Sequence, residues 1–463
     1  MKKKIILSLP YGMSIRDLAS QDFLKVLSDK YDIFLFSTIF NDPKSKKYFK
    51  NFKNIHHLNY KKNNFLEIIL ISIISNLKTI KFIKKNRTLS FTTMMKSLKN
   101  GNSNVVFEGS YKQLNSKILN FIVSLSLLYY PIIYISKFLL FLSSLKYFNL
   151  FFNKKISLFF TSHPYCNLDY PLEYCARLFG CKTIAMIHSW DNITTKMMMH
   201  FKYKKIYVWN KVMSNQLKKF YKYKSKNLYV TGIPQFDDYE ISNNFLSKKK
   251  LDKIIKFKKK RIVTCFCGCP DFTPNFENII LSMSKLFEDT KLSNNYKFVV
   301  RCHPGYDYSW TKKIQKYENT FVNIPGNLAV PMEVEKLNKV EEERQFLCSI
   351  LKHSDIILNF FSTTALDAVY FDKPVIGICI DGNSDENLPG SQLSYYYQWD
   401  HYKNLMKTKG IDLCKNIEQL PKLIKKAENL NYKKLGRKKI FDTQIIYKDG
   451  CSRKRIAKDL IKD

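Results

Sequence analysis

The stretch DIILNFFSTTALDAVYFDKPVIG, residues 355–377, has the pattern of a strand, a short helix and a second strand. The apolar run at 355–361 predicts one buried strand, and the run at 374–378 predicts another. Between them the chain turns at three consecutive hydroxyl residues, 362–364, before the helix begins. Two buried strands joined by a helix are typical of a parallel sheet, because parallel strands need a crossover connection.

The same alternation of strands and helices runs through two parts of the chain, residues 1–241 and 261–463. Residues 242–260 between them are polar and basic, and we interpret them as a linker or as the first helix of the second part. The pattern predicts an α/β protein with two doubly wound, Rossmann-like domains that face one another across a cleft, the second ending in a basic helical tail. Ligands of such sheets bind outside the carboxyl ends of the strands, so functional residues are expected there.

The chain has 463 residues and a formal net charge of +38, from 77 Lys and Arg against 39 Asp and Glu. This excess favours anionic partners such as nucleic acid, acidic lipid or phosphorylated substrates. The sequence has no zinc-finger, helix-turn-helix or RNA-recognition pattern, so we expect no specific nucleic-acid partner. The abundance of Lys, Asn, Ile, Phe and Tyr offers another source of the charge, an A/T-biased coding background.

The 11 cysteines are irregularly spaced, which predicts free thiols. Cys265, Cys267 and Cys269 alternate along a predicted strand, whereas zinc ligands usually occur as spaced pairs. No Asp-x-Asp pair follows a predicted strand either, so we predict no metal site and no cofactor. The opening MKKKIILSLP lacks the apolar length and cleavage site of a secretory signal, which favours a cytoplasmic protein.

Residues 118–152 interrupt the alternation with a long apolar segment, of which 118–136 carry no charge. Three interpretations compete: buried helices of the first domain, a helical hairpin in the membrane interface, and a true membrane span. Nearby lysines would hold an apolar face against anionic lipid, which predicts a peripheral protein on the inner face of the plasma membrane. These lysines are Lys117, Lys137, Lys146, Lys154 and Lys155.

Polar residues follow the predicted strand at 355–361 at once. The hydroxyls of Ser362, Thr363 and Thr364, with the N–H groups of the helix start, are suited to bind phosphate. Asp367, one turn further on, would reach a ribose diol. The structural alternative is a capping box formed by Thr364 and Asp367, worth ~0.5–2 kcal/mol without any ligand.

Arg301 and His303 follow another apolar strand and precede a Pro-Gly turn, in FVVRCHPGYDY. A guanidinium and an imidazole at one strand end can both donate hydrogen bonds to a diphosphate. The alternative is a turn with a capped histidine.

The first domain offers IAMIHSWDNITTK, in which His188 ends a predicted strand and Asp191 follows it. Either residue is a candidate general base for an acceptor hydroxyl. In the alternative interpretation Trp190 packs into the core, while Asp191 and Asn192 form an Asx turn.

Five stretches in this order, HSWDNITTK, VWN (208–210), VTGIPQFDDY, RCHPGYD and SDIILNFFSTTALDAVYFDKPVIG, resemble those of GT-B-type bacterial surface-polysaccharide glycosyltransferases. They also resemble polyol-phosphate transferases related to the CDP-glycerol glycerophosphotransferases. The resemblance covers roughly residues 155–380. One departure is Ser189 after His188, where the glycerophosphotransferases usually carry a His-Gly turn.

The resemblance implies roles for the candidate residues. In the second domain, His303 and the hydroxyls at 362–364 would hold the phosphates of a nucleotide-activated donor, and Asp367 would bind its ribose. In the first domain, the acceptor would meet the loop LPYGMS (9–14) and the turn after His188. The acceptor-side candidates are Tyr11, Gly12, Asn192 and Lys196.

The function that follows is transfer of a sugar from a nucleotide-sugar donor to a surface polysaccharide or a lipid-linked glycan, without a metal. The alternatives are a polyol-phosphate transferase of the CDP-glycerol type and a nucleotide-sugar epimerase. A second alternative is a non-catalytic basic protein that binds a membrane surface or RNA.

Overall fold

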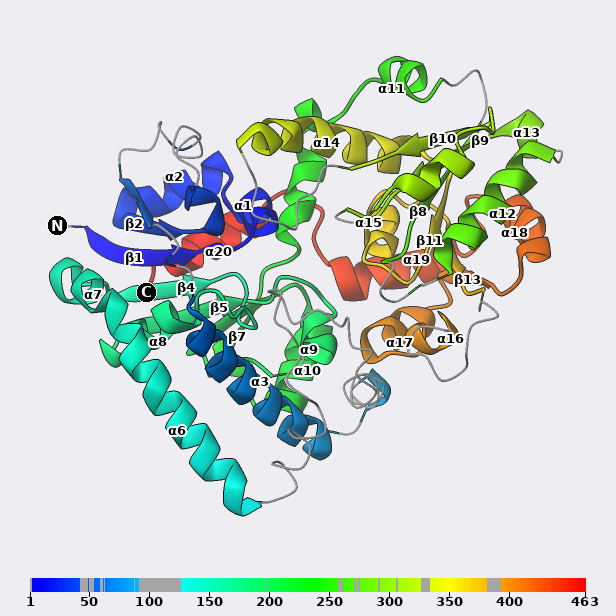
Figure 1. Ribbon diagram of the computed structural model, residues 1–463. Coiled ribbons are helices and arrows are strands. Elements are labelled where there is room, and N and C mark those ends of the chain that lie inside the picture. Colours follow the sequence, from blue (N-terminus) through cyan, green and yellow to red (C-terminus); the bar gives the residue numbers. More distant parts are fainter. Residues whose placement is uncertain are drawn as a thin grey trace. The chain divides into compact units, whose positions relative to one another are not determined.

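The computed structural model describes most of the chain in two units (Figure 1). The residues described are 2–41, 49, 54–58, 61, 63–86, 88–90, 126–196, 198–256, 261–269, 273, 275–289, 292–304, 307–325, 334–380 and 393–463. The first unit consists chiefly of Met1–Pro234 and Cys451–Asp463, and the second chiefly of Gln235–Val330 and Glu335–Gly450.

A parallel sheet forms the centre of the first unit. Its described strands lie in the order β3-β2-β1-β4-β5-β6-β7, so the order reverses between β1 and β4. Buried apolar side chains fill the central strands, as a sheet covered on both faces requires. The strands are β1 (Lys3–Ser8), β2 (Tyr31–Phe36), β3 (Ile55–Leu58), β4 (Leu158–Thr161), β5 (Lys182–Met186), β6 (Lys205–Val208) and β7 (Leu228–Val230).

Helices of the first unit start at capping residues that the sequence supplies. Asn64 and Glu67 form a capping box at the start of α3, and Asn210 caps α10 through Met213 N–H at 2.9 Å. The described helices of the unit are α1 (Gly12–Leu18), α2 (Gln21–Lys30), α3 (Phe65–Lys85), α6 (Ser126–Ser144), α7 (Phe148–Lys154), α8 (Tyr170–Leu178), α9 (Asn192–Thr195), α10 (Lys211–Tyr221) and α20 (Ser452–Leu460).

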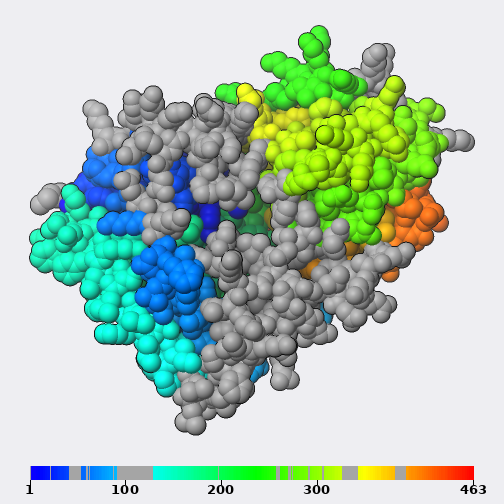
Figure 2. Space-filling view, in the orientation of Figure 1, coloured from blue at the N-terminus to red at the C-terminus, as the bar shows by residue number. Residues whose placement is uncertain are grey.

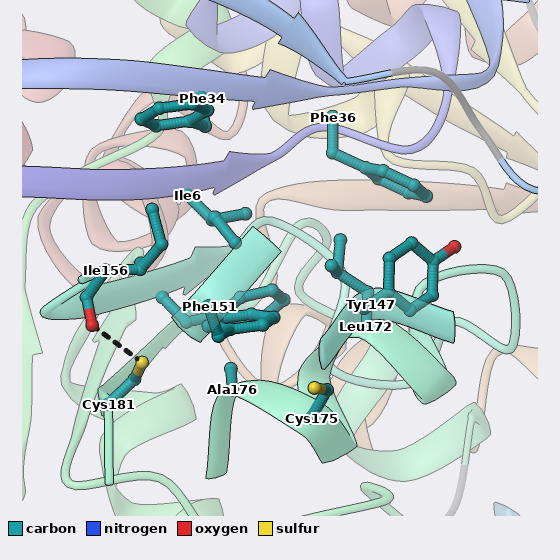
Figure 3. Close-up of a cluster of buried hydrophobic side chains, with 11 residues drawn as sticks. Ile6, Phe34, Phe36, Tyr147, Phe151, Ile156, Leu172, Cys175, Ala176 and Cys181 are labelled. Atoms are coloured by element: carbon teal, nitrogen blue, oxygen red, sulfur yellow. Dashed lines mark hydrogen bonds between the residues drawn. The ribbon is translucent and has the colours of Figure 1, made fainter. Parts of the chain in front are cut away.

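One core of the first unit lies between the sheet and the pair α7 and α8 (Figure 3). Phe34 and Phe36 of β2 point toward Phe151 of α7 and Leu172 of α8. These four side chains are at most 5% exposed, and full burial of each contributes ~1.5–3 kcal/mol.

A second core lies between α3, α6 and α8. Leu70, Ile74 and Leu77 of α3 pack against Ile133 and Leu140 of α6. Figure 1 shows α6, in cyan, beside α3, in blue. The apolar segment 118–152 is therefore helical over its described part, 126–152, and one face of it belongs to the fold of this unit.

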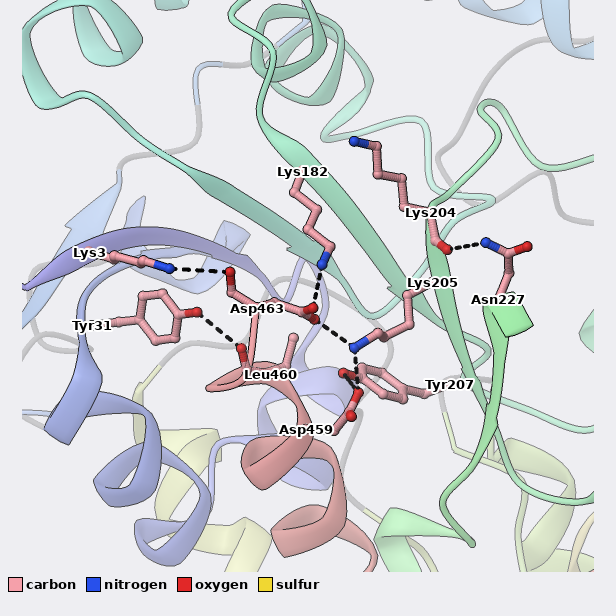
Figure 4. A network of polar contacts seen from close by, with 10 residues as sticks. All are labelled: Lys3, Tyr31, Lys182, Lys204, Lys205, Tyr207, Asn227, Asp459, Leu460 and Asp463. Carbon is pink, nitrogen blue, oxygen red and sulfur yellow. Dashed lines mark hydrogen bonds and ion pairs between the residues drawn. The ribbon is translucent and has the colours of Figure 1, made fainter. Parts of the chain in front are cut away.

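The last helix, α20, belongs to the first unit, although the sequence placed everything after 261 in the second domain. Figure 4 shows why: Asp459 accepts hydrogen bonds from Lys205 Nζ at 2.7 Å and from Tyr207 Oη at 2.8 Å. Asp463 pairs with Lys182 and Lys205. A charged side chain as buried as Lys205 needs such partners, so the basic sheet edge retains the acidic end of this helix.

The second unit repeats the architecture. Its described strands lie in the order β10-β9-β8-β11-β12-β13, all parallel, with the reversal between β8 and β11. The strand, helix and strand of 355–377 are β11, α15 and β12, which confirms the predicted α/β class. The strands are β8 (Arg261–Phe266), β9 (Tyr296–Arg301), β10 (Thr320–Asn323), β11 (Ile356–Asn359), β12 (Val375–Ile378) and β13 (Ile411–Cys414).

The segment 242–260, expected to be a linker or a first helix, contains the helix α11 (Lys248–Ile254) within its described residues. Leu251 of α11 is fully buried, and Leu246 N–H donates to Ser349 Oγ at 2.7 Å, so this part of the segment is built into the second unit. The other described helices of the unit are α12 (Phe276–Asp289), α13 (Leu292–Asn295), α14 (Val334–His353), α15 (Thr364–Tyr370), α16 (Leu393–Tyr396), α17 (Asp400–Met406), α18 (Leu420–Ala427) and α19 (Lys434–Ile440).

Candidate active site

Polar side chains of the first unit meet where the strand order reverses. The loops after β1 and β4 start side by side, because Ser8 of β1 is paired with Thr161 of β4. The loop after the neighbouring strand β5 begins beside them. The reversal of strand order at the carboxyl ends is the position at which doubly wound sheets bind ligands.

Three rings from these three loops lie in contact. The rings of His163, after β4, and His188, after β5, are stacked with centroids 4.3 Å apart. The ring of Tyr11, after β1, meets His163 edge-on at 5.2 Å. The structure therefore brings His188 together with Tyr11 and with a histidine that the sequence analysis did not select.

Asp17 of α1 orients His188. Its Oδ2 lies 3.4 Å from His188 Nε2, and the Asp17 side chain is only 1% exposed. A carboxylate this close to Nε2 favours the tautomer with its hydrogen on Nε2 and its lone pair on Nδ1. His188, 12% exposed, thus has a carboxylate beside its imidazole, an arrangement that is suited to proton transfer.

Asp17 stays ionised in spite of its burial. Burial alone would raise its pKa, but the positive charges of Arg16, His188 and Arg453 outweigh it and hold the pKa below its ordinary value. Arg16 Nε donates to Asp17 Oδ1 at 2.5 Å. Arg453 of α20 donates to the Asp17 carbonyl at 2.6 Å, so the last helix supports the site.

His163 is a neutral neighbour of this pair. Burial lowers its pKa well below the ordinary value, and the charges of His188 and Lys196 lower it further. Its Nδ1 lies 3.0 Å from both Ser14 Oγ and Ser162 Oγ. His163 therefore stays uncharged beside His188, and it contributes a neutral polar side chain to the site.

Asp191, the other candidate base, is engaged in its own turn. Its Oδ1 accepts from Ser189 Oγ, and its Oδ2 accepts from Thr195 Oγ1 at 2.9 Å. It also precedes the short helix α9, in which Asn192 is buried. The carboxylate of Asp191 is thus engaged within its own turn, and the roles of Asp191 as base and of Asn192 at the acceptor stay predictions.

The two remaining acceptor-side candidates have separate positions. Gly12 is buried as the first residue of α1, directly after Tyr11. Lys196 is the C-cap residue that follows α9, and it lies near enough to His163 to affect its pKa.

In the second unit, Ser362 and Thr364 form a closed turn. Their hydroxyl oxygens lie 2.6 Å apart, and Ser362 Oγ accepts from Thr364 N–H at 3.2 Å. Asn359, the last residue of β11, donates to both hydroxyls, and Tyr402 Oη donates to Asn359 Oδ1 at 2.8 Å. The turn is therefore built before any ligand arrives, which the residue types alone did not indicate.

Thr363 differs from its neighbours. It is the N-cap residue of α15, and its side chain makes no cap hydrogen bond. Of the three hydroxyls, it is the one that takes no part in the hydrogen bonds described for this turn.

Asp367 is buried and bonded within its own unit. It is 8% exposed, and its Oδ1 accepts a hydrogen bond from Tyr239 Oη. The predicted capping box is not formed, since Thr363 rather than Thr364 is the N-cap. A ribose at Asp367 would have to replace or share the bond to Tyr239.

Arg301 and His303 lie at the same sheet edge, two strands away from Ser362 in the strand order. Adjacent strands are ~4.8 Å apart, which puts the ends of β9 and β11 about 10 Å from each other. Arg301 is 8% exposed and pairs with Glu343 at 3.0 Å, so the carboxylate of Glu343 offsets much of its positive charge. His303 is half-buried, with Nδ1 3.0 Å from the Pro304 carbonyl.

The loop after β8 runs between these two groups. A Cβ added to Gly268 would come 2.6 Å from Thr273 Oγ1 and 3.1 Å from Phe360 Cβ. Glycine is needed there because the loop passes close to the end of β11. Among the residues that the structure describes, no group of three or more His, Cys, Asp or Glu side chains is placed to hold a metal ion.

Comparison with solved structures identifies the architecture. The chain is similar to UDP-GlcNAc 2-epimerase from Neisseria meningitidis bound to UDP-GlcNAc, with a TM-score of 0.53, 14% identity and 100% of both chains covered. It is also similar to UDP-GlcNAc 2-epimerase from Methanocaldococcus jannaschii, with a TM-score of 0.51, 12% identity and 100% of both chains covered. At these identities the likeness concerns the fold, which is the GT-B arrangement of two Rossmann-like domains.

No curated protein sequence matches the chain. Residues 185–462 match the family described as CDP-Glycerol:Poly(glycerophosphate) glycerophosphotransferase. Fold and family together define a GT-B transferase that uses a nucleotide-activated donor, rather than an epimerase or a non-catalytic basic protein. The chain belongs to the CDP-glycerol:poly(glycerophosphate) glycerophosphotransferase family.

Sequence reasoning missed Asp17 and His163 as members of the site. Asp17 stands in a predicted helix after the 9–14 loop, and His163 follows the strand FFTS directly. His163 could have been selected from the sequence, because a histidine immediately after an apolar strand is the same pattern that selected His188 and His303.

Asp169 links the two strands at the reversal. Its Oδ2 accepts from Ser8 Oγ of β1 at 2.6 Å and from Thr161 Oγ1 of β4 at 3.2 Å. Burial, together with the charge of Glu173, raises its pKa to about 7. The folded state thus keeps a proton that the unfolded chain releases near pH 4.

We predict that Asp169→Asn removes a pH dependence of stability. Where the folded pKa of a carboxyl is raised, the unfolded state binds fewer protons between pH 4 and pH 7, so stability falls as pH rises. Each pKa unit corresponds to ~1.4 kcal/mol, so the free energy of unfolding of the variant rises by up to about 4 kcal/mol relative to the wild type between pH 4 and pH 8. Urea unfolding across this range measures it. Asp22→Asn, at an exposed position, is the control, and a flat difference for Asp169→Asn would contradict the raised pKa.

Proposed function

We propose that this protein transfers a sugar from a nucleotide-sugar donor to a hydroxyl of a surface polysaccharide or lipid-linked glycan. The observation that carries the transfer chemistry is the pair Asp17 and His188 at the strand reversal of the first unit. Full-length likeness to an enzyme bound to UDP-GlcNAc agrees with a sugar nucleotide as donor.

In this proposal, His188 takes the proton of the acceptor hydroxyl on Nδ1 while Asp17 balances the positive charge that forms on the ring. General base catalysis by a positioned side chain raises the rate of such a reaction by about 10²- to 10⁴-fold. His163, held neutral beside it, keeps a second positive charge away from the protonated ring. No step requires a metal.

The donor is assigned to the second unit. The phosphates would be bound by the hydroxyl of Thr363, the N–H groups at the start of α15 and His303. The first two follow β11 and His303 follows β9, so all of them lie at one edge of the sheet. The buried turn of Asn359, Ser362 and Thr364 fixes the backbone around Thr363. Arg301 and Asp367 would support this surface through Glu343 and Tyr239.

A second candidate is transfer of a polyol phosphate from a CDP-linked donor, and the family match favours it. Both reactions need the same base on the acceptor hydroxyl. They differ in the bond that breaks: the sugar–phosphate bond in sugar transfer, and the phosphate–phosphate bond in polyol-phosphate transfer.

The nucleotide released from a panel of donors separates the two reactions. We expect a UDP-, GDP- or CDP-sugar to yield the nucleoside diphosphate, as measured by chromatography of the products with a membrane fraction as acceptor source. Release of CMP from CDP-glycerol, with no turnover of any sugar nucleotide, would replace sugar transfer by polyol-phosphate transfer.

The assignment of the base is tested by three substitutions. We expect His188→Ala to reduce the turnover number by about 10²- to 10⁴-fold. Asp17→Asn is expected to reduce it less and to shift the pH at which the rate falls on acidification, because the imidazole loses its carboxylate. Asp191→Asn is the matched control. Full activity of His188→Ala together with loss in Asp191→Asn would transfer the role to Asp191.

A membrane surface is proposed as the place of this reaction. Among the described residues, one continuous stretch, Tyr129–Lys154, is long and apolar enough to cross a membrane by length and composition. One face of it is packed against α3 and α8, and this anchorage favours an interfacial helix over a free span. The exposed face is also apolar, whereas a surface helix in water carries polar residues there.

This exposed face, here called the α6 stripe, follows a spacing of three or four residues. Tyr134 is 65% exposed, Phe138 60% and Phe152 62%. Figure 2 shows α6, in cyan, at the surface of the first unit. The α6 stripe consists of Tyr130, Tyr134, Ile135, Phe138, Leu142, Leu145, Phe148 and Phe152.

Lysines accompany the stripe in the manner of interfacial helices. Lys81 Nζ donates to Tyr130 Oη at 2.9 Å, and Lys137 Nζ lies 5.6 Å from the ring centre of Tyr134. Lys154 and Lys155 are exposed at the end of α7. Tyrosine rings at the headgroup level and lysines toward anionic lipid are the pattern of a helix that lies on a membrane.

We predict that Tyr134→Ser with Phe138→Ser weakens binding to vesicles of phosphatidylglycerol and phosphatidylcholine. A buried aromatic side chain contributes ~1.5–3 kcal/mol, so the pair is expected to lower the partition coefficient by about 100-fold or more. Vesicle flotation measures it. Leu435→Ser, at a 77% exposed position of the second unit, is the control. Unchanged flotation of the double variant would exclude the α6 stripe as the contact.

A further inference from the structure

A pocket of about 410 Å³ opens between α3, α6 and α8 in the first unit. This volume falls within the range of small-molecule sites, roughly 300–1,000 Å³. The segment 200–202 completes its wall. None of the residues discussed for acceptor or donor binding lines this pocket.

Four cationic side chains line the pocket, and they come from all the elements that form it. Lys78 belongs to α3, Lys137 to α6, Arg177 to α8 and Lys202 to the segment after it. None of the described lining residues is acidic. Glu173 pairs with Arg177 at 2.7 Å and accepts from Tyr203 Oη at 2.8 Å, so it offsets the charge of Arg177.

The pKa of Lys78 shows the effect of the positive charges that line the pocket. Burial, followed by the charges of Lys137 and Arg177, lowers its pKa to about 8. Its Nζ donates to the His200 carbonyl at 2.9 Å. The His200 ring adds no charge, since burial and Lys78 lower its pKa to about 3. An anion in the pocket would relieve this repulsion.

Aromatic rings form the rest of the wall. Tyr170 and Tyr174 of α8 line the pocket with Phe201, and the guanidinium of Arg177 lies 4.5 Å from the ring centre of Phe201. Arg177 Nε and Nη2 donate to Glu173, and its Nη1 donates to the Lys202 carbonyl, so this guanidinium is held in place and the three lysines are the cations left to contact an anion. The pocket thus combines charge for an anion with apolar walls for the group that carries it.

The pocket borders the α6 stripe. Lys137 stands in the sequence between Tyr134 and Phe138, and the lining residue Leu178 is 48% exposed. The pocket therefore lies where α6 carries both a lining lysine and the exposed aromatic side chains next to it in the sequence.

We infer that this pocket binds the phosphate of an amphiphilic phosphate ester, such as a lipid headgroup at the membrane surface. The inference rests on the membrane contact proposed above, but it does not depend on which group the enzyme transfers. A soluble phosphate ester shares the charge and would fill the same cationic end without using the apolar rim.

Lys78→Met tests the site, because it removes the buried charge and keeps an unbranched side chain. The matched control is Lys84→Met, an exposed position on the same helix that changes the net charge equally. Three probes are compared by calorimetry on the full chain: monomeric dihexanoyl phosphatidic acid, dihexanoyl phosphatidylcholine with the same acyl chains, and glycerol 1-phosphate. Thermal unfolding without ligand verifies that both variants fold.

We expect phosphatidic acid to bind the wild type and Lys84→Met alike, and to bind Lys78→Met at least tenfold more weakly. Phosphatidylcholine is expected to bind weakly to all three. If glycerol 1-phosphate binds the wild type as tightly as phosphatidic acid does, and this binding is lost in Lys78→Met, the phosphate site is supported and its ligand is identified as soluble. Absence of binding by both phosphate probes, or equal binding to the two variants, would overturn the inference.

Release of nucleotide from the donor, measured on the same variants, keeps this result separate from the proposed function. We expect Lys78→Met to release nucleotide at the wild-type rate in a detergent-solubilised assay, because Lys78 touches neither candidate reaction site. If no donor is turned over by the wild type, the transfer proposal fails while the phosphate site stands on its own measurement.

Discussion

The parallel pairing of β1 with β2 on one side and β4 on the other is the constraint on which the candidate active site depends. β5 pairs in parallel with β4 in turn, so the loops that follow β1, β4 and β5 emerge at one edge of the sheet. The reversal of strand order then turns successive connections to opposite faces. Tyr11, His163 and His188, which lie far apart in the sequence, meet for that reason alone. The second unit repeats the constraint with β8 and β11.

Buried charge is the cost of this arrangement, and the fold compensates for it from a distance. Asp17 is ionised at 1% exposure, which is tolerable because Arg16 and His188 are beside it and Arg453 reaches it from the last helix. That helix is itself attached by Asp459 to Lys205 and Tyr207. The end of the chain therefore supports the electrostatics of a site formed near its beginning.

The apolar segment has two roles that local sequence cannot separate. Residues on one face of α6, such as Ile133 and Leu140, complete a core with α3, while Tyr134 and Phe138 on the opposite face remain exposed. Composition made the whole segment apolar, so the sequence left burial, interface and span as competing interpretations. Only the position of α3 and α8 divides it into a packed face and an exposed one.

The sequence by itself determined the α/β class, the two runs of strands and helices, and the positions at which polar residues follow strands. These are local properties, because apolar periodicity and turn residues act over a few positions. It also placed His188 after a strand and Thr363 at the start of a helix. Only the tertiary structure decided which polar groups are already engaged: Asp191 in its own turn, Asp367 with Tyr239. It alone paired Asp17 with His188 and moved α20 to the first unit, since hydrogen bonds and ion pairs between distant segments leave no local pattern.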